Sequence, residues 1–151
     1  MEGITIENLP VRLLDTLYQI EKQCFKQEAF SKRQITYLLT DNNAISFAAY
    51  VNGELAGFII GHLDIERNQS AGHILTIDVV TQYRRKGIAQ KLMHEVEETV
   101  KQKGAKECRL EVREDNTAAL NLYQKLGYKK IAKLENYYPT AHGLYLLKPL
   151  T

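Results

Sequence analysis

The chain has no tryptophan, only two cysteines and three prolines among its 151 residues, and no long apolar run. No stretch approaches the roughly 18 apolar residues that a membrane span needs. The N-terminus shows no basic segment followed by an apolar one, so we expect a cytoplasmic protein. Cys24 and Cys108 lack the paired C-x-x-C spacing of zinc and redox sites, and we expect both to be free thiols.

Net charge is also small. Twenty Lys and Arg residues against eighteen Asp and Glu residues give a net charge of +2. No overall field therefore favours nucleic acid or an anionic membrane as a partner. The four histidines show no ligand spacing with one another or with the cysteines, so we expect no metal site. Any anion site must be local.

What is present is the balance of an ordinary globular protein, with 44% hydrophobic and 25% charged residues. A chain of this length buries about two thirds of its unfolded surface without disulfides or metals. No linker, repeat or low-complexity segment interrupts it. We therefore expect one domain over residues 1–151.

Hydrophobic periodicity predicts alternating strands and helices. The first half reads as a strand over 3–8, a helix opened by Pro10, a helix over 32–40 behind Ser31 as N-cap, and strands over 44–51 and 54–64 joined by the turn dipeptide Asn52-Gly53. After a polar interruption over 66–72, the second half reads as a strand over 73–80, a helix over about 87–103, a strand over 107–113, a helix from Asn116 to Gly127, and strands over 128–135 and 143–149. This order predicts an α+β domain around a mixed, mainly antiparallel sheet.

A basic, glycine-containing loop, Arg84-Arg85-Lys86-Gly87-Ile88-Ala89, joins the strand over 73–80 to the next helix. A helix N-terminus leaves backbone N–H groups unpaired and carries about half a positive charge, which makes it a natural seat for a phosphate. Gly87 lets the backbone approach such a group closely because it has no Cβ. Taken alone, the loop fits a solvated basic turn equally well.

The segment that follows decides between these interpretations. It contains Leu110-Glu111-Val112-Arg113, Asn116 and the run Ala119-Leu120-Asn121-Leu122-Tyr123-Gln124-Lys125-Leu126-Gly127-Tyr128. Together with the loop, these residues resemble the acetyl-CoA-binding core of the GNAT superfamily, in which R/Q-x-x-G-x-G/A precedes N-x-x-A-x-x-L-Y-x-x-x-G-F/Y. The joint match spans residues 74–128. Within the superfamily, Glu111-Val112-Arg113 and Asn136-Tyr137-Tyr138-Pro139-Thr140 resemble the ribosomal-protein-alanine and archaeal N-terminal acetyltransferases.

The resemblance implies a single GNAT-like domain, a three-layer α/β arrangement in which a twisted sheet is flanked by helices and its fourth and fifth strands splay to hold CoA. It implies acetyl-CoA as co-substrate and no metal. Pantetheine would pair with backbone groups of Ile77 and Val79, and its pyrophosphate would lie on the loop. The residues implied to bind the donor are Ile77, Asp78, Val79, Arg84, Arg85, Lys86, Gly87, Ile88, Ala89, Asn116 and Tyr123.

For the chemistry, the resemblance implies Glu111 as general base, through a water, and Tyr123 as general acid toward the departing thiolate. It implies Phe30, Tyr137 and Tyr138 as acceptor-binding residues. Each has a plainer interpretation: Glu111 fits a solvated strand residue, and Tyr123 fits core packing. Asn116 also fits a simple helix N-cap, and in a chain with nine tyrosines, two can lie at the surface by coincidence.

The function implied is acetyl transfer to a primary amine, the N-terminal α-amine of a protein such as a ribosomal protein, by a monomer or weak homodimer. Two alternatives stay open. The segment Ala141-His142-Gly143-Leu144-Tyr145 lacks the acidic pattern usual before the last strand, which favours a small amine or a lysine as acceptor. A non-catalytic acyl-CoA sensor would lack the acid or the base, and both are present. A P-loop protein is disfavoured because no G-K-[ST] follows the glycine.

Overall fold

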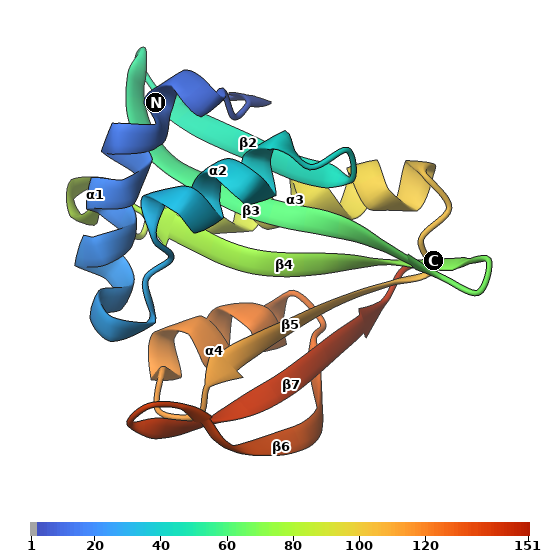
Figure 1. Ribbon diagram of the computed structural model, residues 1–151. Helices are drawn as coiled ribbons and strands as arrows, with labels where there is room; N and C mark the ends of the chain where they lie inside the picture. Colours follow the sequence, from blue (N-terminus) through green and yellow to red (C-terminus); the bar gives the residue numbers. More distant parts are fainter. Residues whose placement is uncertain (1–2) are drawn as a thin grey trace.

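The computed structural model describes residues 3–151 and shows a seven-stranded sheet with helices on both faces (Figure 1). In chain order the strands are β1 Ile4–Asn8, β2 Ala44–Val51, β3 Glu54–Glu66, β4 Gln69–Val79, β5 Glu107–Arg113, β6 Lys129–Tyr138 and β7 Ala141–Pro149. The helices are α1 Leu14–Phe25, α2 Lys32–Thr40, α3 Ile88–Gln102 and α4 Thr117–Lys125, and the 3-10 turns are η1 Val11–Leu13, η2 Lys26–Glu28 and η3 Thr81–Tyr83. The predicted α+β fold with a mixed sheet is confirmed.

Helices α1 and α2 cover one face of the sheet, toward the viewer in Figure 1. Leu17 of α1, Ile35 of α2 and Phe58 of β3 are fully buried. They belong to the hydrophobic core on this face of the sheet. The start of α2 is fixed by a capping box, in which Ser31 accepts from the Gln34 backbone and the Gln34 side chain accepts from Ser31. The loop before α2 is therefore held in one conformation.

Helix α3 covers the opposite face behind β2, β3 and β4, and α4 lies on that face behind the strands that follow (Figure 1). Leu92, Val96 and Val100 recur every four residues along α3, so they form one stripe, and all three are fully buried. Tyr123 of α4 belongs to the same core. The two faces thus have separate hydrophobic cores with the sheet between them.

The strand order is β1-β2-β3-β4-β5-β7-β6, and every neighbouring pair is antiparallel except β4 and β5. These two parallel strands pair only where Gly72–Ile74 meets Cys108–Leu110. A Cβ on Gly72 would lie 2.8 Å from the Cys108 sulfur, so glycine permits this close contact. Beyond Ile74 the strands diverge (Figure 1), which places the predicted splay in the half of β4 that precedes the basic loop.

Three predicted boundaries are wrong. The polar segment 66–72 does not interrupt the sheet, because Arg67 and Asn68 adopt positive φ (49° and 66°) and turn the chain in two residues. Its polarity reflects an exposed hairpin tip. Likewise β6 extends to Tyr138 and β7 begins at Ala141, so that only Pro139 and Thr140 lie between them. The helix opened by Pro10 begins with the separate 3-10 turn η1.

Among residues 3–151, no helix has the length and apolar character to cross a membrane.

Candidate active site

The basic loop ends at the N-terminus of α3, as predicted. Gly87 is the N-cap residue, with a left-handed φ of 81°. No side chain among residues 3–151 caps the helix, and no acidic residue occupies its first turn. A Cβ on Gly87 would meet nothing within 4 Å. Residues 84–87 are all exposed. The positive end of a 15-residue helix is therefore open beside three basic residues, which fits a pyrophosphate.

Arg84 does not extend from this loop. Its Nε donates to the Val79 carbonyl at 3.2 Å, and its Nη2 lies 3.7 Å from the Cys24 sulfur. The guanidinium thus ties the end of β4 to the end of α1. Because Val79 is a residue that we expect to pair with pantetheine, Arg84 holds the backbone at one end of the expected donor site, and its direct contact with the donor stays a prediction.

The Asp78 side chain lies in a buried polar cluster with Glu21 and Thr76. Asp78 and Glu21 are each 1% exposed. The Thr76 hydroxyl lies 2.9 Å from Glu21 Oε1 and 2.9 Å from Asp78 Oδ1, and the Phe30 amide donates to Glu21 Oε2 at 3.0 Å. Asp78 Oδ2 has no hydrogen-bond partner among the described residues. A contact between Asp78 and the donor would have to involve its backbone, and it stays a prediction.

One hydroxyl proton cannot serve both carboxylates, and two buried carboxylates side by side repel. Burial, reinforced by Glu21, raises the pKa of Asp78 well above its usual range. Asp78 therefore keeps its proton in the folded state at pH values where the unfolded chain has lost it. Such a group lowers stability progressively as pH rises above its unfolded pKa of about 4.

Replacing this acid by its neutral isostere should stabilise the protein at neutral pH. We expect Asp78→Asn to raise the free energy of unfolding at pH 8 relative to the unmodified chain, and to leave it nearly unchanged at pH 3.5. Urea unfolding at both pH values measures this. Asp15→Asn, at a surface carboxylate that pairs with Lys32, is the control. Parallel stability curves for the Asp78 variant and the unmodified chain would contradict a protonated Asp78.

Helix α4 supplies two further predicted residues. The Asn116 side chain accepts from the Ala119 backbone at 3.1 Å, so its N-cap role is confirmed, and donor contact stays a prediction. Tyr123 is buried, with its ring edge-on to Tyr128 at a centroid distance of 5.9 Å. Burial raises the pKa of Tyr123. Its phenol is therefore protonated at neutral pH, as a general acid must be.

Glu111 lies on the polar face of β5, one residue beyond the last pair that joins β5 to β4. Its Oε1 is 2.8 Å from His73 Nε2, and the side chains are 20% and 22% exposed. The spacing of the histidines, which concerns metal sites, does not indicate His73 as a site residue. The alternation of β4 was a usable signal: since Ile74 faces the α3 core, His73 faces the other way.

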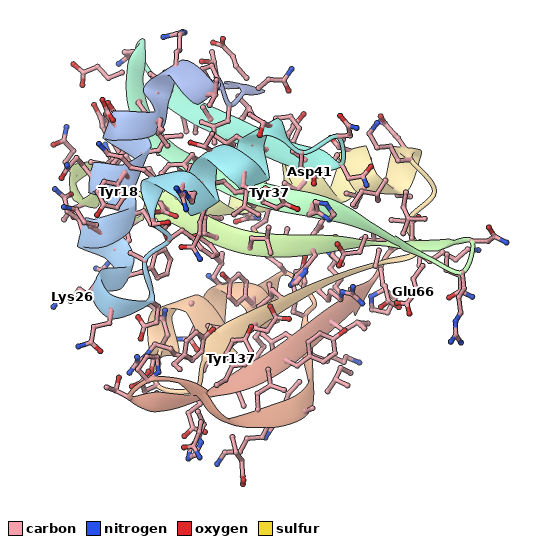
Figure 2. The ribbon with its side chains drawn as sticks, in the orientation of Figure 1. Tyr18, Lys26, Tyr37, Asp41, Glu66 and Tyr137 are labelled. Atoms are coloured by element: carbon pink, nitrogen blue, oxygen red, sulfur yellow. The ribbon has the colours of Figure 1, made fainter. Side chains whose placement is uncertain are left out.

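The predicted aromatic pair lies on the same side as this carboxylate. The rings of Tyr137 and Tyr138 meet edge to face at 4.9 Å, and burial together with nearby charges including Glu111 raises the pKa of both phenols. A Cβ on Gly143 would lie 3.1 to 3.3 Å from Tyr137 side-chain atoms. Glycine at position 143 therefore makes room for the Tyr137 ring, seen in Figure 2 below strand β4.

Arg113 joins this aromatic segment to the loop that carries Phe30. Its Nη1 donates to Glu28 of η2 and, at 3.1 Å, to the Thr140 hydroxyl in the β6–β7 turn. The Asp115 carboxylate binds the same guanidinium at 2.9 and 3.0 Å. Both predicted walls of the acceptor site are thus fixed to the end of β5, close in sequence to Glu111. The candidate site therefore includes an exposed helix N-terminus that can bind an anion, the protonated phenol of Tyr123, and the Glu111 carboxylate with its aromatic neighbours.

Comparisons with known proteins agree with this geometry. The acetyltransferase (GNAT) family model matches residues 14–128. An N-alpha-acetyltransferase of Sulfurisphaera tokodaii is 35% identical over 72% of this chain and 71% of its own, and the ribosomal protein bS18-alanine N-acetyltransferase of Escherichia coli is 29% identical over 92% and 90%. A chain of the NatC complex, solved with Gag peptide and CoA, superposes with a TM-score of 0.89 at 26% identity over 99% of both chains. The chain belongs to the acetyltransferase (GNAT) family.

Proposed function

We propose that the protein transfers the acetyl group of acetyl-CoA to the free α-amine at the N-terminus of a protein. The observation that carries the proposal is the placement of Glu111, which is bonded to His73 where β4 and β5 diverge and lies near both rings of the aromatic pair. The names of its relatives support the same acceptor class, N-termini of proteins, one of them ribosomal. A ribosomal protein is accordingly our candidate acceptor.

The proposed donor site follows from the loop and the splay. The first-turn N–H groups of α3, with Arg85 and Lys86, would hold the pyrophosphate, and Gly87 leaves room for it. Pantetheine would run along Ile77 and Val79, which are not paired to β5. The acetyl group would then arrive between the two strands, with Tyr123 of α4 behind it.

In the reaction, Glu111 takes a proton from the α-ammonium, directly or through a water. The amine nitrogen then attacks the acetyl carbonyl carbon, the C–N bond forms and the C–S bond breaks. Tyr123 gives its proton to the departing thiolate and recovers one afterwards. Overall, an ammonium becomes an amide, the thioester becomes a thiol, and one proton is released to solvent.

An α-amine suits a single carboxylate base better than a lysine does. The pKa of an α-amine lies about two units below that of a lysine amine, so its neutral form is about a hundred times more abundant at pH 7. The walls formed by Phe30 and the aromatic pair also suit an extended peptide, whose backbone can be bonded whatever its side chains.

A competition assay tests the acceptor. One peptide carries a free N-terminal alanine and an internal lysine, and a second is the same peptide blocked at its N-terminus. We expect mass spectrometry to locate the acetyl group on the α-amine, with a rate at least about tenfold above that of the blocked peptide, in keeping with the abundance of neutral amine. Equal or faster reaction of the blocked peptide, or of spermidine, would favour the lysine or small-amine alternative.

The segment 141–145, which motivated the lysine or small-amine alternative because it lacks acidic residues, has a structural role. His142 Nδ1 accepts from the Asn136 amide at 2.8 Å, and Asn136 has a positive φ of 54°. The sheet register shifts there, between Leu134 and Tyr138. His142 therefore stabilises the irregular backbone that presents Tyr137, and this argues for an acceptor wall in this chain built without the usual acidic residues.

A further inference from the structure

Glu111 and His73 are one end of a longer chain of charged side chains on the same face of the sheet. His73 Nδ1 lies 3.3 Å from Asp64 Oδ2. Asp64 Oδ1 lies 2.6 Å from His62 Nδ1, and His62 Nε2 lies 3.1 Å from Asp41 Oδ1. Carboxylates and imidazoles thus alternate from β5 across β4 and β3 to the loop after α2. In Figure 2 the labelled Asp41 lies above β4, on the side opposite to Tyr137.

Strand register builds this arrangement. His62 is the cross-strand partner of His73 in the β3–β4 pair, and His73 is the partner of Arg109 in the β4–β5 pair. Cross-strand partners point to the same face, and so do residues two apart on one strand. Asp64 and Glu111, each two residues beyond a partner of His73, therefore flank it. The arrangement depends on the backbone pairing of three strands and not on flexible surface side chains.

Asp64 is the centre of the network. It contacts His62 and His73, and it also accepts a hydrogen bond of 2.5 Å from Arg109 Nη2. Burial works to raise the pKa of Asp64, but the hydrogen bonds from Arg109 and His62 outweigh it, and the net pKa is lowered. Burial likewise works to lower the pKa of His62, and its bonds to Asp64 and Asp41 reverse the direction. Asp64 is therefore an anion at neutral pH, held in place from two sides.

We propose that Asp64 is a positioning residue for the base, which orients the His73 ring so that Nε2 faces Glu111 and keeps a proton on Nδ1. A hydrogen bond at one imidazole nitrogen fixes the tautomer, and so decides what the other nitrogen can do. With Nδ1–H directed at Asp64, Nε2 is the nitrogen that shares a proton with Glu111. His62 and Asp41 act one step further out by holding Asp64. The inference rests on the proposed acetyl transfer, for which Glu111 is the base.

Several charged groups surround His73. Glu111 and Arg109 face it from β5, and Asp64 and His62 face it from β3. Tyr145 of β7 contacts Arg109, and Tyr137 of β6 lies near Glu111. Removing the Asp64 charge therefore takes away the carboxylate that His73 Nδ1 contacts and leaves Glu111 as the carboxylate at Nε2.

Asp64→Asn tests the proposal, because it removes the charge and keeps the size of the side chain. We expect kcat to fall about tenfold or more, the scale of one charge-assisted hydrogen bond. KM for acetyl-CoA should stay within about twofold, because the proposed pyrophosphate seat lies at α3, on the other face. The surface variant Asp15→Asn should change none of these quantities.

A double-mutant cycle separates positioning from a general structural role. In a His73→Gln background, Asp64→Asn should cost little further activity, because its effect passes through the ring. An undiminished loss there would overturn the proposal. If Asp64→Asn does not fold, His62→Gln replaces it, with a smaller expected loss that again vanishes in the His73→Gln background.

Histidine NMR of the free protein provides a readout that needs no activity. We expect Asp64→Asn to shift the imidazole signals of His62 and His73, assigned from the His→Gln variants, and to leave those of His94 on α3 unchanged. Unaltered His73 signals would overturn the inference. Failure of the proposed function looks different: the unmodified chain would then acetylate no peptide N-terminus, whatever the NMR shows.

Discussion

Gly87→Glu will abolish measurable acetyl-CoA binding. The substitution places a carboxylate at the uncapped N-terminus of α3, where we expect the pyrophosphate, and fills space that is open around Gly87. Two anions would then compete for the same backbone N–H groups. Calorimetry should show the dissociation constant raised at least about a hundredfold, the loss of roughly two charge-assisted contacts.

The chain carries its own matched control for this experiment. Gly104 lies just beyond the other end of α3, has a similar φ of 95° and is equally open, with nothing within 4 Å of an added Cβ. Gly104→Glu therefore carries the same backbone strain, about 1 kcal/mol, and the same added charge. It should bind acetyl-CoA normally. If the Gly87 variant bound normally as well, the donor site would lie elsewhere.

The loop and helix N-terminus that we propose as the donor site could be predicted from the sequence because their parts are local. A strand, a basic glycine loop and a helix follow one another within about 30 residues, and helix N-termini bind anions for reasons of backbone geometry alone. The capping by Ser31 and the stripe along α3 are local in the same sense. In the structure these residues lie close together because they are already close in the sequence.

The base and its surroundings could be predicted only in part, because their contacts join distant segments. Position 73 is 38 residues from position 111, and their hydrogen bond follows from the parallel pairing of β4 with β5, which no local pattern states. The Glu21–Asp78 pair needs α1 to pack on β4. Arg84 has a local reason to bind a phosphate, and a nonlocal contact with Cys24 redirects its side chain.

Removing the base charge should have the second large effect. Glu111→Gln keeps the size of the side chain and an oxygen that can accept from His73, but it cannot take a proton from the amine. General bases are typically worth 10²–10⁴-fold, and we expect kcat to fall within that range near pH 7. The affinity for acetyl-CoA should not change, because Glu111 faces away from the α3 N-terminus.

The pH dependence of this loss identifies the step that is affected. Near pH 7 most of an α-amine is protonated, and by pH 9 most is neutral without help. The ratio of unmodified to variant activity should therefore shrink as pH rises from 6.5 to 9. A loss that is constant with pH would mean that Glu111 positions the acceptor and does not take its proton.

Two variants complete the comparison. Glu107 lies on the same strand and face as Glu111, four residues away, at the end where β5 pairs with Pro149. Glu107→Gln should leave turnover unchanged, so a general effect of removing a β5 carboxylate is separated from the loss of the base. Tyr123→Phe should lower kcat with little change in acetyl-CoA affinity, because we propose that its buried, protonated phenol acts on the departing thiolate. Wild-type rates in both the Glu111 and Tyr123 variants would contradict the mechanism. If Tyr123→Phe removed nearly all activity and Glu111→Gln removed little, water and not Glu111 would be the group that takes the proton from the amine.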